Sequence, residues 1–227
     1  YYQSHPEEAK KDGCINKEGQ WILSIKQKQN ILLNNIYGVD IDNQAVEVTQ
    51  LSLALKMLED ESTATANEMQ VLFHEKILPD LSKNIVCGNS LIGTDILQGK
   101  MFPTEEERKL NPMDFEKRFP EIMKNGGFDA IVGNPPYLRI QGMQEHHPLA
   151  VEYLKKKYLS ASSGSIDIYV IFLERLLKLI NSKGLTGYIL PHKFFQADFG
   201  KNIRSIISNQ RAISKILNFG ANQIFDN

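Results

Sequence analysis

Short apolar runs that end in polar residues alternate with amphipathic segments along the chain, and this alternation limits its fold more than any other feature. The runs predicted as strands are residues 36–40, 85–87, 130–132, 185–190 and 212–220. The segments predicted as helices are residues 43–59, 165–184 and 198–209. Because parallel strands need crossover connections, usually helices, this order predicts an α/β fold built on a doubly wound sheet.

The composition is typical of a soluble globular protein, with 42% hydrophobic and 23% charged residues in a chain of 227. No apolar run approaches the length that crosses a bilayer, so a membrane role is excluded. Only two cysteines, Cys14 and Cys87, are present. They form neither a disulfide framework nor a CxxC-type cluster, so we expect no metal site and a reducing, cytoplasmic location.

The formal net charge is −1, so no global positive field indicates nucleic-acid binding. Any DNA binding must be local or be supplied by a part of the protein outside this sequence. The start at Tyr1 and the abrupt end at Asn227 indicate a piece of a longer protein. We predict a polar segment at 1–30, with turns at "KKDG" and "NKEGQ", that leads into one domain at 31–227. Residues 61–69 and 103–112 are predicted as surface loops.

Polar residues stand at the ends of four of the predicted strands. In a doubly wound sheet, ligands bind at the carboxyl ends of the strands. We therefore predict one cleft lined by these strand ends: Asp40 with Asp42, Asn89, Asn134, and Pro191 with His192.

Two of these residues have a binding interpretation and a structural one. Asp40 can accept hydrogen bonds from the ribose of a nucleotide-type cofactor, or it can cap the next helix, a role that Asp42 fits better. Asn89 can read an adenine edge by donating and accepting at once, or it can form an Asx-turn. The sequence alone leaves both alternatives open.

The stretch "FDAIVGNPPYLRI" runs an apolar strand into Asn134, Pro135, Pro136 and Tyr137. Two consecutive prolines fix their own φ and donate no backbone hydrogen bond, so they stop the strand and hold the next atoms rigidly. The Asn134 side-chain oxygen and the Pro135 carbonyl can then accept both N–H groups of an amine conjugated to an aromatic ring, which localises the nitrogen lone pair. Tyr137 offers a flat face to a base taken out of its duplex. The alternative is a proline turn without chemistry.

Other candidate residues give weaker indications of a function. His146 and His147 have no carboxylate at metal-ligand spacing, and we predict that both lie on the surface. The segment "YLKKKY", residues 153–158, is predicted as a solvated helix face, with phosphate contact as the alternative. Neither GxSxG nor GxxxxGK[ST] occurs, so nucleophilic hydrolases and P-loop proteins lack support.

Five segments in order resemble the gamma class of DNA adenine-N6 methyltransferases: "IYGVDIDNQAVEVTQLSLAL", "NIVCGNSLIG", "FDAIVGNPPYLRIQ", "SIDIYVIFLE" and "GLTGYILPHKFF". The chain looks most like the fused restriction-modification enzymes of type IIG. The resemblance implies a Rossmann-like sheet, the cofactor S-adenosylmethionine, and methyl transfer to N6 of adenine in double-stranded DNA. Protein glutamine methyltransferases also carry NPPY, and a non-catalytic scaffold piece of a restriction complex is a further alternative.

By position, the resemblance implies that Asp40 holds the cofactor ribose and that Ile41, Asn89 and Ser90 lie beside the cofactor adenine. Residues 134–137 would form the catalytic loop, with Asn134 also against the cofactor. Residues 166–169 match the family's fifth motif, beside the cofactor and the target base, and Pro191 belongs to its sixth.

The family's glycine-rich first motif, which cradles the methionine part of the cofactor, has no match in residues 1–30. We therefore expect an incomplete sheet that lacks its first and last strands, no target-recognition or nuclease domain, and little activity from this piece alone. The first strand lies in the middle of this family's sheet, so its neighbours would expose unpaired edges. Those edges would either close the gap or pair with another chain to form an oligomer.

Overall fold

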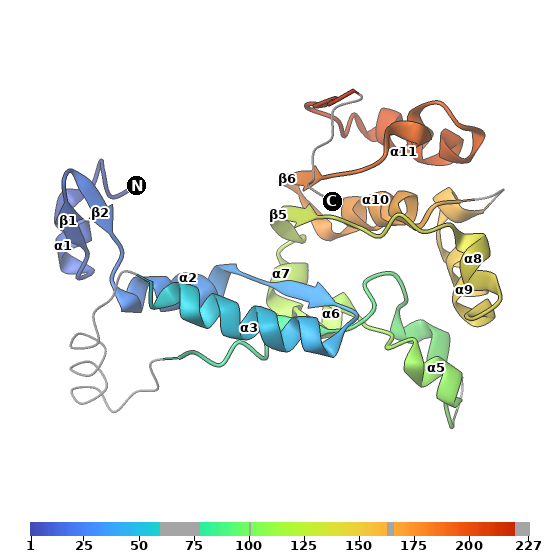
Figure 1. Ribbon diagram of the computed structural model, residues 1–227, viewed down its shortest axis with the longest axis horizontal. Helices are drawn as coiled ribbons and strands as arrows, with labels where there is room; N and C mark the ends of the chain where they lie inside the picture. The colour runs from blue at the N-terminus through green and yellow to red at the C-terminus, as the bar shows by residue number, and fades with distance from the viewer. Residues whose placement is uncertain (60–77, 100, 163–165, 221–227) are drawn as a thin grey trace. The chain divides into compact units, whose positions relative to one another are not determined.

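The computed structural model describes residues 1–59, 78–99, 101–162 and 166–220, and the chain divides into two units, 1–90 and 91–227 (Figure 1). The loop predicted at 61–69 lies outside the described residues. Each unit has its own cluster of buried apolar side chains. None of the described helices is long and apolar enough to span a bilayer.

The first unit begins with a short helix and a hairpin. The turn predicted at "NKEGQ" is confirmed, because Glu18 and Gly19 adopt positive φ values of 51° and 84°, as a two-residue hairpin turn requires. The elements of this unit are α1 (Pro6–Lys11), β1 (Ile15–Lys17), β2 (Gln20–Ile22), α2 (Ile25–Asn35), β3 (Gly38–Asp40), α3 (Asn43–Met57) and β4 (Ile85–Cys87).

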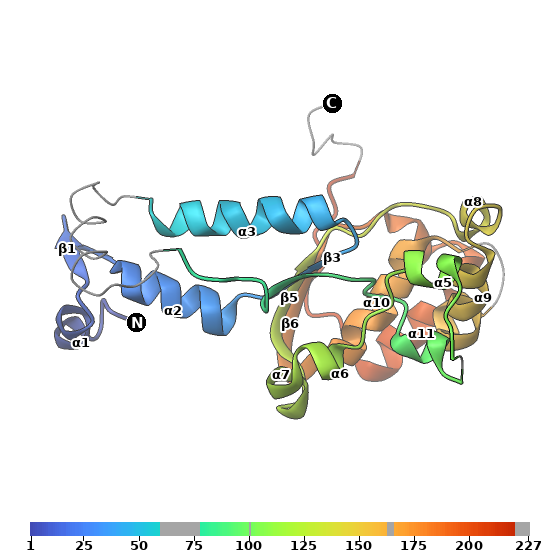
Figure 2. The same cartoon turned by 90° about the horizontal axis from the view of Figure 1, so that it is seen from below.

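The strands β3 and β4 pair in parallel, with Asp40 opposite Cys87. Helix α3 lies alongside α2 in both views of the chain (Figure 1, Figure 2). Asn84 fixes the end of α2, since its side-chain Nδ2 donates to the carbonyls of Leu33 and Ile36 at 2.8 and 3.0 Å. The buried cluster comprises Ile25, Leu32, Val46, Met57, Leu81 and Ile85.

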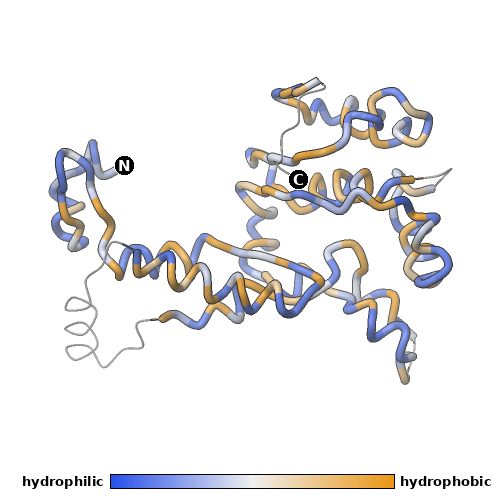
Figure 3. The backbone as a smooth tube through the Cα atoms, viewed as in Figure 1, coloured by the Kyte–Doolittle hydropathy of each residue, from blue (hydrophilic) through white to orange (hydrophobic). Residues whose placement is uncertain are grey.

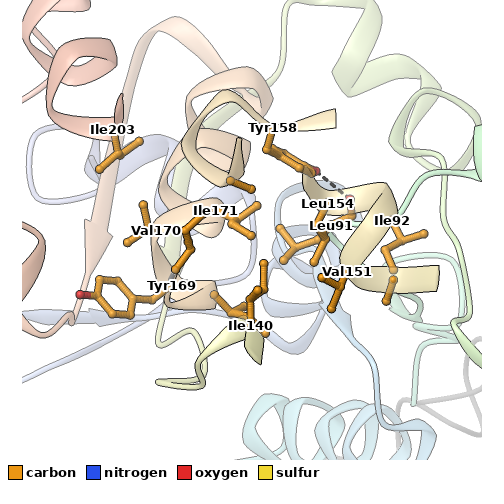
Figure 4. Packing of buried hydrophobic residues seen from close by; sticks show 14 of the residues in the cluster. Leu91, Ile92, Ile140, Val151, Leu154, Tyr158, Tyr169, Val170, Ile171 and Ile203 are labelled. Carbon is orange, nitrogen blue, oxygen red and sulfur yellow. Dashed lines mark hydrogen bonds between the residues drawn. The ribbon is translucent and has the colours of Figure 1, made fainter. Parts of the chain in front are cut away.

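The second unit is built around α10, along which apolar residues recur (Figure 3). Its buried cluster also takes side chains from α9 and α11 (Figure 4). The elements are η1 (Thr94–Leu97), α5 (Glu105–Lys109), α6 (Phe115–Arg118), α7 (Pro120–Lys124), β5 (Phe128–Gly133), α8 (Ile140–Gln144), α9 (Pro148–Lys157), η2 (Leu159–Ala161), α10 (Ile168–Leu179), β6 (Ile180–Tyr188), η3 (His192–Phe195), η4 (Asp198–Gly200) and α11 (Lys201–Gln210).

The α/β class is confirmed, and the sheet is fragmented in the described residues. They form three two-stranded sheets: β1–β2 is antiparallel, and β3–β4 and β5–β6 are parallel. Each parallel pair forms across its own helical crossover. No strand in the described ranges hydrogen-bonds to both parallel pairs.

The predicted end of the long helix at Gly184 is also wrong, because α10 ends at Leu179 and β6 begins at once. The register jumps from Phe128 opposite Ile180 to Ala130 opposite Leu185, so residues 181–184 bulge out of the ladder. Gly184 serves this bulge: a Cβ there would lie 2.3 Å from Cγ1 of Ile180. The regular ladder then starts at Leu185, as predicted.

Two predictions of irregular and extended structure also fail. The loop predicted at 103–112 contains α5, which starts with a capping box between Thr104 and Glu107. The strand predicted at 212–220 is not formed, and its apolar side chains Ile213, Ile216, Leu217 and Phe219 are exposed. A strand needs a hydrogen-bonded neighbour, and the described residues offer none to this segment.

Candidate active site

The first group of predicted site residues follows β3. Asp40 ends this strand, and its Oδ1 accepts a hydrogen bond from the Asp42 N–H at 2.8 Å. Asp42 in turn caps α3, because its Oδ1 accepts from the Gln44 N–H at 2.8 Å. The competing N-cap role therefore falls to Asp42. Asp40 stays exposed, and its carboxylate can accept a further hydrogen bond from a hydroxyl group.

The other residues of this group follow β4. The Gly88 N–H donates to the Asp40 carbonyl at 2.8 Å, which holds the chain after β4 against the end of β3. Asn89 and Ser90 come next and are half-buried, while the Ile41 side chain is 56% exposed. The first unit thus brings all four residues to the carboxyl ends of the paired strands β3 and β4. A carboxylate for a ribose, an amide for a base edge and an open apolar side chain fit the adenosine part of S-adenosylmethionine.

The second group follows β5. Gly133 ends this strand opposite Tyr188, and a Cβ on Gly133 would lie 2.6 Å from Tyr188 Cε1, so only glycine allows this packing. Next come Asn134, which is exposed, and Pro135, which is buried. Within the described ranges no backbone N–H is bonded to the Pro135 carbonyl. The Asn134 side-chain oxygen and the Pro135 carbonyl, the two predicted acceptors, therefore both follow the end of β5.

Tyr137 folds back onto this loop. Its hydroxyl lies 3.0 Å from Asn134 Oδ1 and 3.0 Å from the carbonyl oxygen of Ile189, just beyond β6. The tyrosine is 49% exposed, so much of its ring stays open to solvent. The loop is thus tied to both strands of the β5–β6 pair.

The segment of the predicted fifth motif runs beside this loop. The Ile140 N–H donates to the Ile166 carbonyl, and the Ile168 N–H donates to the Leu138 carbonyl, each at 2.8 Å. Tyr169 follows, and its ring meets the ring of Tyr137 edge-on, with centroids 6.1 Å apart. Burial raises the pKa of Tyr169 to about 12, so its hydroxyl stays protonated at neutral pH.

Sequence reasoning missed the partners of Tyr137. Ile189 contributes only a backbone carbonyl, which has no sequence signal. Tyr169 lies in a segment that the resemblance places beside the target base, but nothing in the sequence indicates an edge-on contact with Tyr137. The two groups of site residues lie in different units. The single cleft predicted from the strand ends therefore stays a prediction.

A network of side chains anchors α9 in the second unit. The Tyr153 hydroxyl donates to Asp95 Oδ1 at 2.5 Å and accepts from the Gly93 N–H at 3.0 Å, while Lys157 Nζ lies 2.7 Å from Asp95 Oδ2. Burial alone would raise the pKa of Asp95, but hydrogen bonds from Lys157 and Tyr153 hold that pKa below its usual value. The network borders a cavity of about 600 Å³, whose lining includes none of residues 134–137.

The prediction of a solvated face at 153–158 is right only in part. Tyr153 and Lys157 belong to this network, and Tyr158 is buried, with its hydroxyl donating to the Leu91 carbonyl. Lys155 and Lys156 are exposed. His146 and His147 are exposed as predicted, and no cluster of three or more potential metal ligands exists in the part of the chain that the structure describes.

Parallel strands that end in an exposed carboxylate and in Asn-Pro-Pro-Tyr are the features expected of a methyltransferase that acts on a conjugated nitrogen. Comparison with known proteins agrees with this class. Residues 34–225 match the sequence model of the Eco57I restriction-modification methylases. The chain belongs to this family.

Three relatives illustrate the similarity. The type II restriction enzyme and methyltransferase RM.Eco57I of Escherichia coli is 36% identical over 210 residues, covering 92% of this chain and 19% of the relative. A putative type II restriction enzyme and methyltransferase of Methanocaldococcus jannaschii is 22% identical over 85% of this chain and 25% of its own length. The adenine-specific methyltransferase PglX of Streptomyces coelicolor is 21% identical over 83% of this chain and 16% of its own length. The chain thus spans a quarter or less of each.

Proposed function

We propose that the protein transfers a methyl group from S-adenosylmethionine to the N6 amino group of adenine in double-stranded DNA, as part of a restriction-modification enzyme. The observation that carries the proposal is the strand end at Asn134, where an exposed amide oxygen and the Pro135 carbonyl stand side by side in sequence on a proline-fixed loop. The names of the relatives support DNA adenine as the substrate over protein glutamine.

The residues that would hold the cofactor are Asp40, Ile41, Asn89 and Ser90, with Asn134 on the side of the transferred group. Asp40 would accept hydrogen bonds from the ribose, and the Asn89 amide would read the adenine edge. When bound, S-adenosylmethionine supplies an electrophilic methyl group. The chain's own residues have to present the nitrogen to it.

Asn134 and Pro135 do this by accepting hydrogen bonds from the two N–H groups of the target amine. The nitrogen lone pair would then be localised on the nitrogen and available to the methyl group that the cofactor supplies, and the nitrogen would afterwards lose one proton to solvent. Pro135 and Pro136 fix the backbone of this loop before the target arrives, so the Pro135 carbonyl needs little reorganisation during the reaction. The open Tyr137 ring stacks on the extruded adenine, which offsets the few kcal/mol that extrusion costs.

The experiment that tests the proposal is methyl transfer by the full-length enzyme containing this chain, from labelled S-adenosylmethionine to unmethylated duplex DNA, followed by nucleoside analysis. We expect labelled N6-methyladenosine, and no label in DNA whose adenines already carry the N6-methyl group. Label in protein would support the glutamine methyltransferase alternative, and no transfer to any polymer would support the scaffold alternative.

Local positive charge favours DNA as the partner despite the net charge of −1. Residues 136–220 contain twelve Lys and Arg against five Asp and Glu. Lys155 and Lys156 are exposed in the last turn of α9, without a carboxylate partner in the described ranges. We propose that both contact DNA phosphates.

Replacing both lysines by glutamine (K155Q/K156Q) is expected to make DNA binding less salt-dependent. Each lost phosphate contact lowers the slope of log Kobs against log salt concentration by about 0.9, so we expect a change of up to about 2. The measurement is a salt titration of binding to a short duplex. The matched control is K10Q/K11Q, which removes two adjacent lysines from the last turn of α1. An unchanged slope for K155Q/K156Q would contradict the assignment.

Residues 31–227 would form part of the methyltransferase catalytic domain. The type IIG class and the association of copies through the edges of the sheets remain predictions.

A further inference from the structure

The hydroxyl of Tyr137 has two acceptors and one proton. Asn134 Oδ1 and the Ile189 carbonyl oxygen each lie 3.0 Å from it, which is hydrogen-bond distance for both. Neither oxygen can donate, and a hydroxyl donates once. The Tyr137 hydroxyl can therefore donate a hydrogen bond to only one of the two oxygens at a time.

A half-turn of the Asn134 amide removes this conflict. It would place Nδ2 where Oδ1 now lies, so that Nδ2–H donates to the Tyr137 hydroxyl oxygen and the hydroxyl donates to the Ile189 carbonyl. All three groups are then satisfied, and Asn134 Oδ1 points away from Tyr137. In this orientation Oδ1 is free to accept from an incoming amine.

Contacts on both sides of Tyr137 in the chain, and one against its ring, fix the position of the tyrosine. Pro136 fixes the backbone before it, and the Leu138 carbonyl after it accepts the Ile168 N–H at 2.8 Å. Tyr169, only 1% exposed, packs edge-on against the ring. The hydroxyl thus keeps its place between the two oxygens while the Asn134 amide turns.

We propose that Tyr137 acts as a positioning residue through its hydroxyl, which shifts its hydrogen bond from Asn134 Oδ1 to the Ile189 carbonyl and so lets the Asn134 amide oxygen turn toward the target amine. This role is separate from stacking by the ring. This inference rests on the proposed function and deepens it, because it assigns to the Tyr137 hydroxyl the orientation of the Asn134 amide oxygen.

The Y137F variant tests this inference, because it removes the hydroxyl and keeps the ring. We expect kcat for methyl transfer to fall about 3- to 10-fold, the effect of one hydrogen bond. The KM for duplex DNA should stay within about twofold of wild type, as the substrate contacts do not change. Base extrusion, read without cofactor from the fluorescence of 2-aminopurine at the target position, should also be unchanged. Y137A should lose both kcat and the fluorescence signal.

The matched control is Y37F, which removes a hydroxyl that donates to the Asn34 carbonyl at 3.2 Å in the first unit. It should leave kcat unchanged. A Y137F variant with wild-type kcat would overturn the inference, and so would a loss of kcat that is matched by an equal loss of fluorescence. In both cases the proposed function stands if the wild type methylates DNA. A wild type that transfers no methyl group to DNA overturns the proposed function and this inference together.

Discussion

Replacing Asn134 by alanine is expected to lower the rate of methyl transfer by about 100- to 1,000-fold, the loss seen when one preorganised group is removed from a site of developing charge. The alanine removes one of the two acceptors for the target amine, and the Pro135 carbonyl alone leaves the other N–H unbound. The measurement is a single-turnover rate of methyl transfer to duplex DNA with saturating S-adenosylmethionine.

Folding should survive this substitution, because Asn134 is exposed and, among the described residues, the side chain bonded to its amide is the exposed Tyr137. Circular dichroism and DNA binding should therefore match the wild type. Asn125, exposed at the end of α7 in the same unit, gives the matched control, and N125A should transfer methyl groups at the wild-type rate. A fully active N134A would show that "NPPY" is only a rigid turn.

Features fixed by a few neighbouring residues could be predicted from the sequence. The start of α3 at Asn43 depends on the Asp42 side chain, which accepts from an N–H two residues away. The end of β5 depends on Pro135 and Pro136, which cannot extend a ladder. The helix therefore begins, and the strand ends, close to where the sequence indicates, and Asp40 and Asn134 stand at strand ends as expected.

Features that depend on distant partners could not be predicted. Whether two strand pairs share a sheet depends on a common neighbour, and local patterns do not encode one. Glycine commonly follows a helix, so the sequence predicts that Gly184 ends one. Its observed role in the bulge of β6 depends instead on the close approach of Ile180 and of β5. The partner of Tyr137 at Ile189 is 52 residues away and is a backbone atom. Any residue type at position 189 would supply the same backbone carbonyl, so the sequence does not indicate this hydrogen bond.

A buried carboxylate links α10 to η2 in the second unit. Glu174 on α10 is 4% exposed, and its Oε2 accepts from the Ser160 N–H at 2.8 Å while Lys178 Nζ lies 2.7 Å from its Oε1. Burial alone would raise the pKa of Glu174, but the hydrogen bonds from Lys178 and Ser160 outweigh it and hold the pKa below its usual value. The charged form is therefore the one that stabilises the fold.

The E174Q variant is expected to be less stable than wild type at pH 7 by about 1–2 kcal/mol, since a hydrogen bond to a charged group is replaced by a neutral one. A depressed pKa gives stability that is complete above the unfolded value, about 4.3, and is lost as the pH falls through the folded value. The gap between wild type and E174Q should therefore close as the pH is lowered below about 4. Urea unfolding at a series of pH values measures this difference in the free energy of unfolding. E152Q, at an exposed glutamate of α9, should show no such gap, and an E174Q deficit that stays constant down to acid pH would refute the assigned charge.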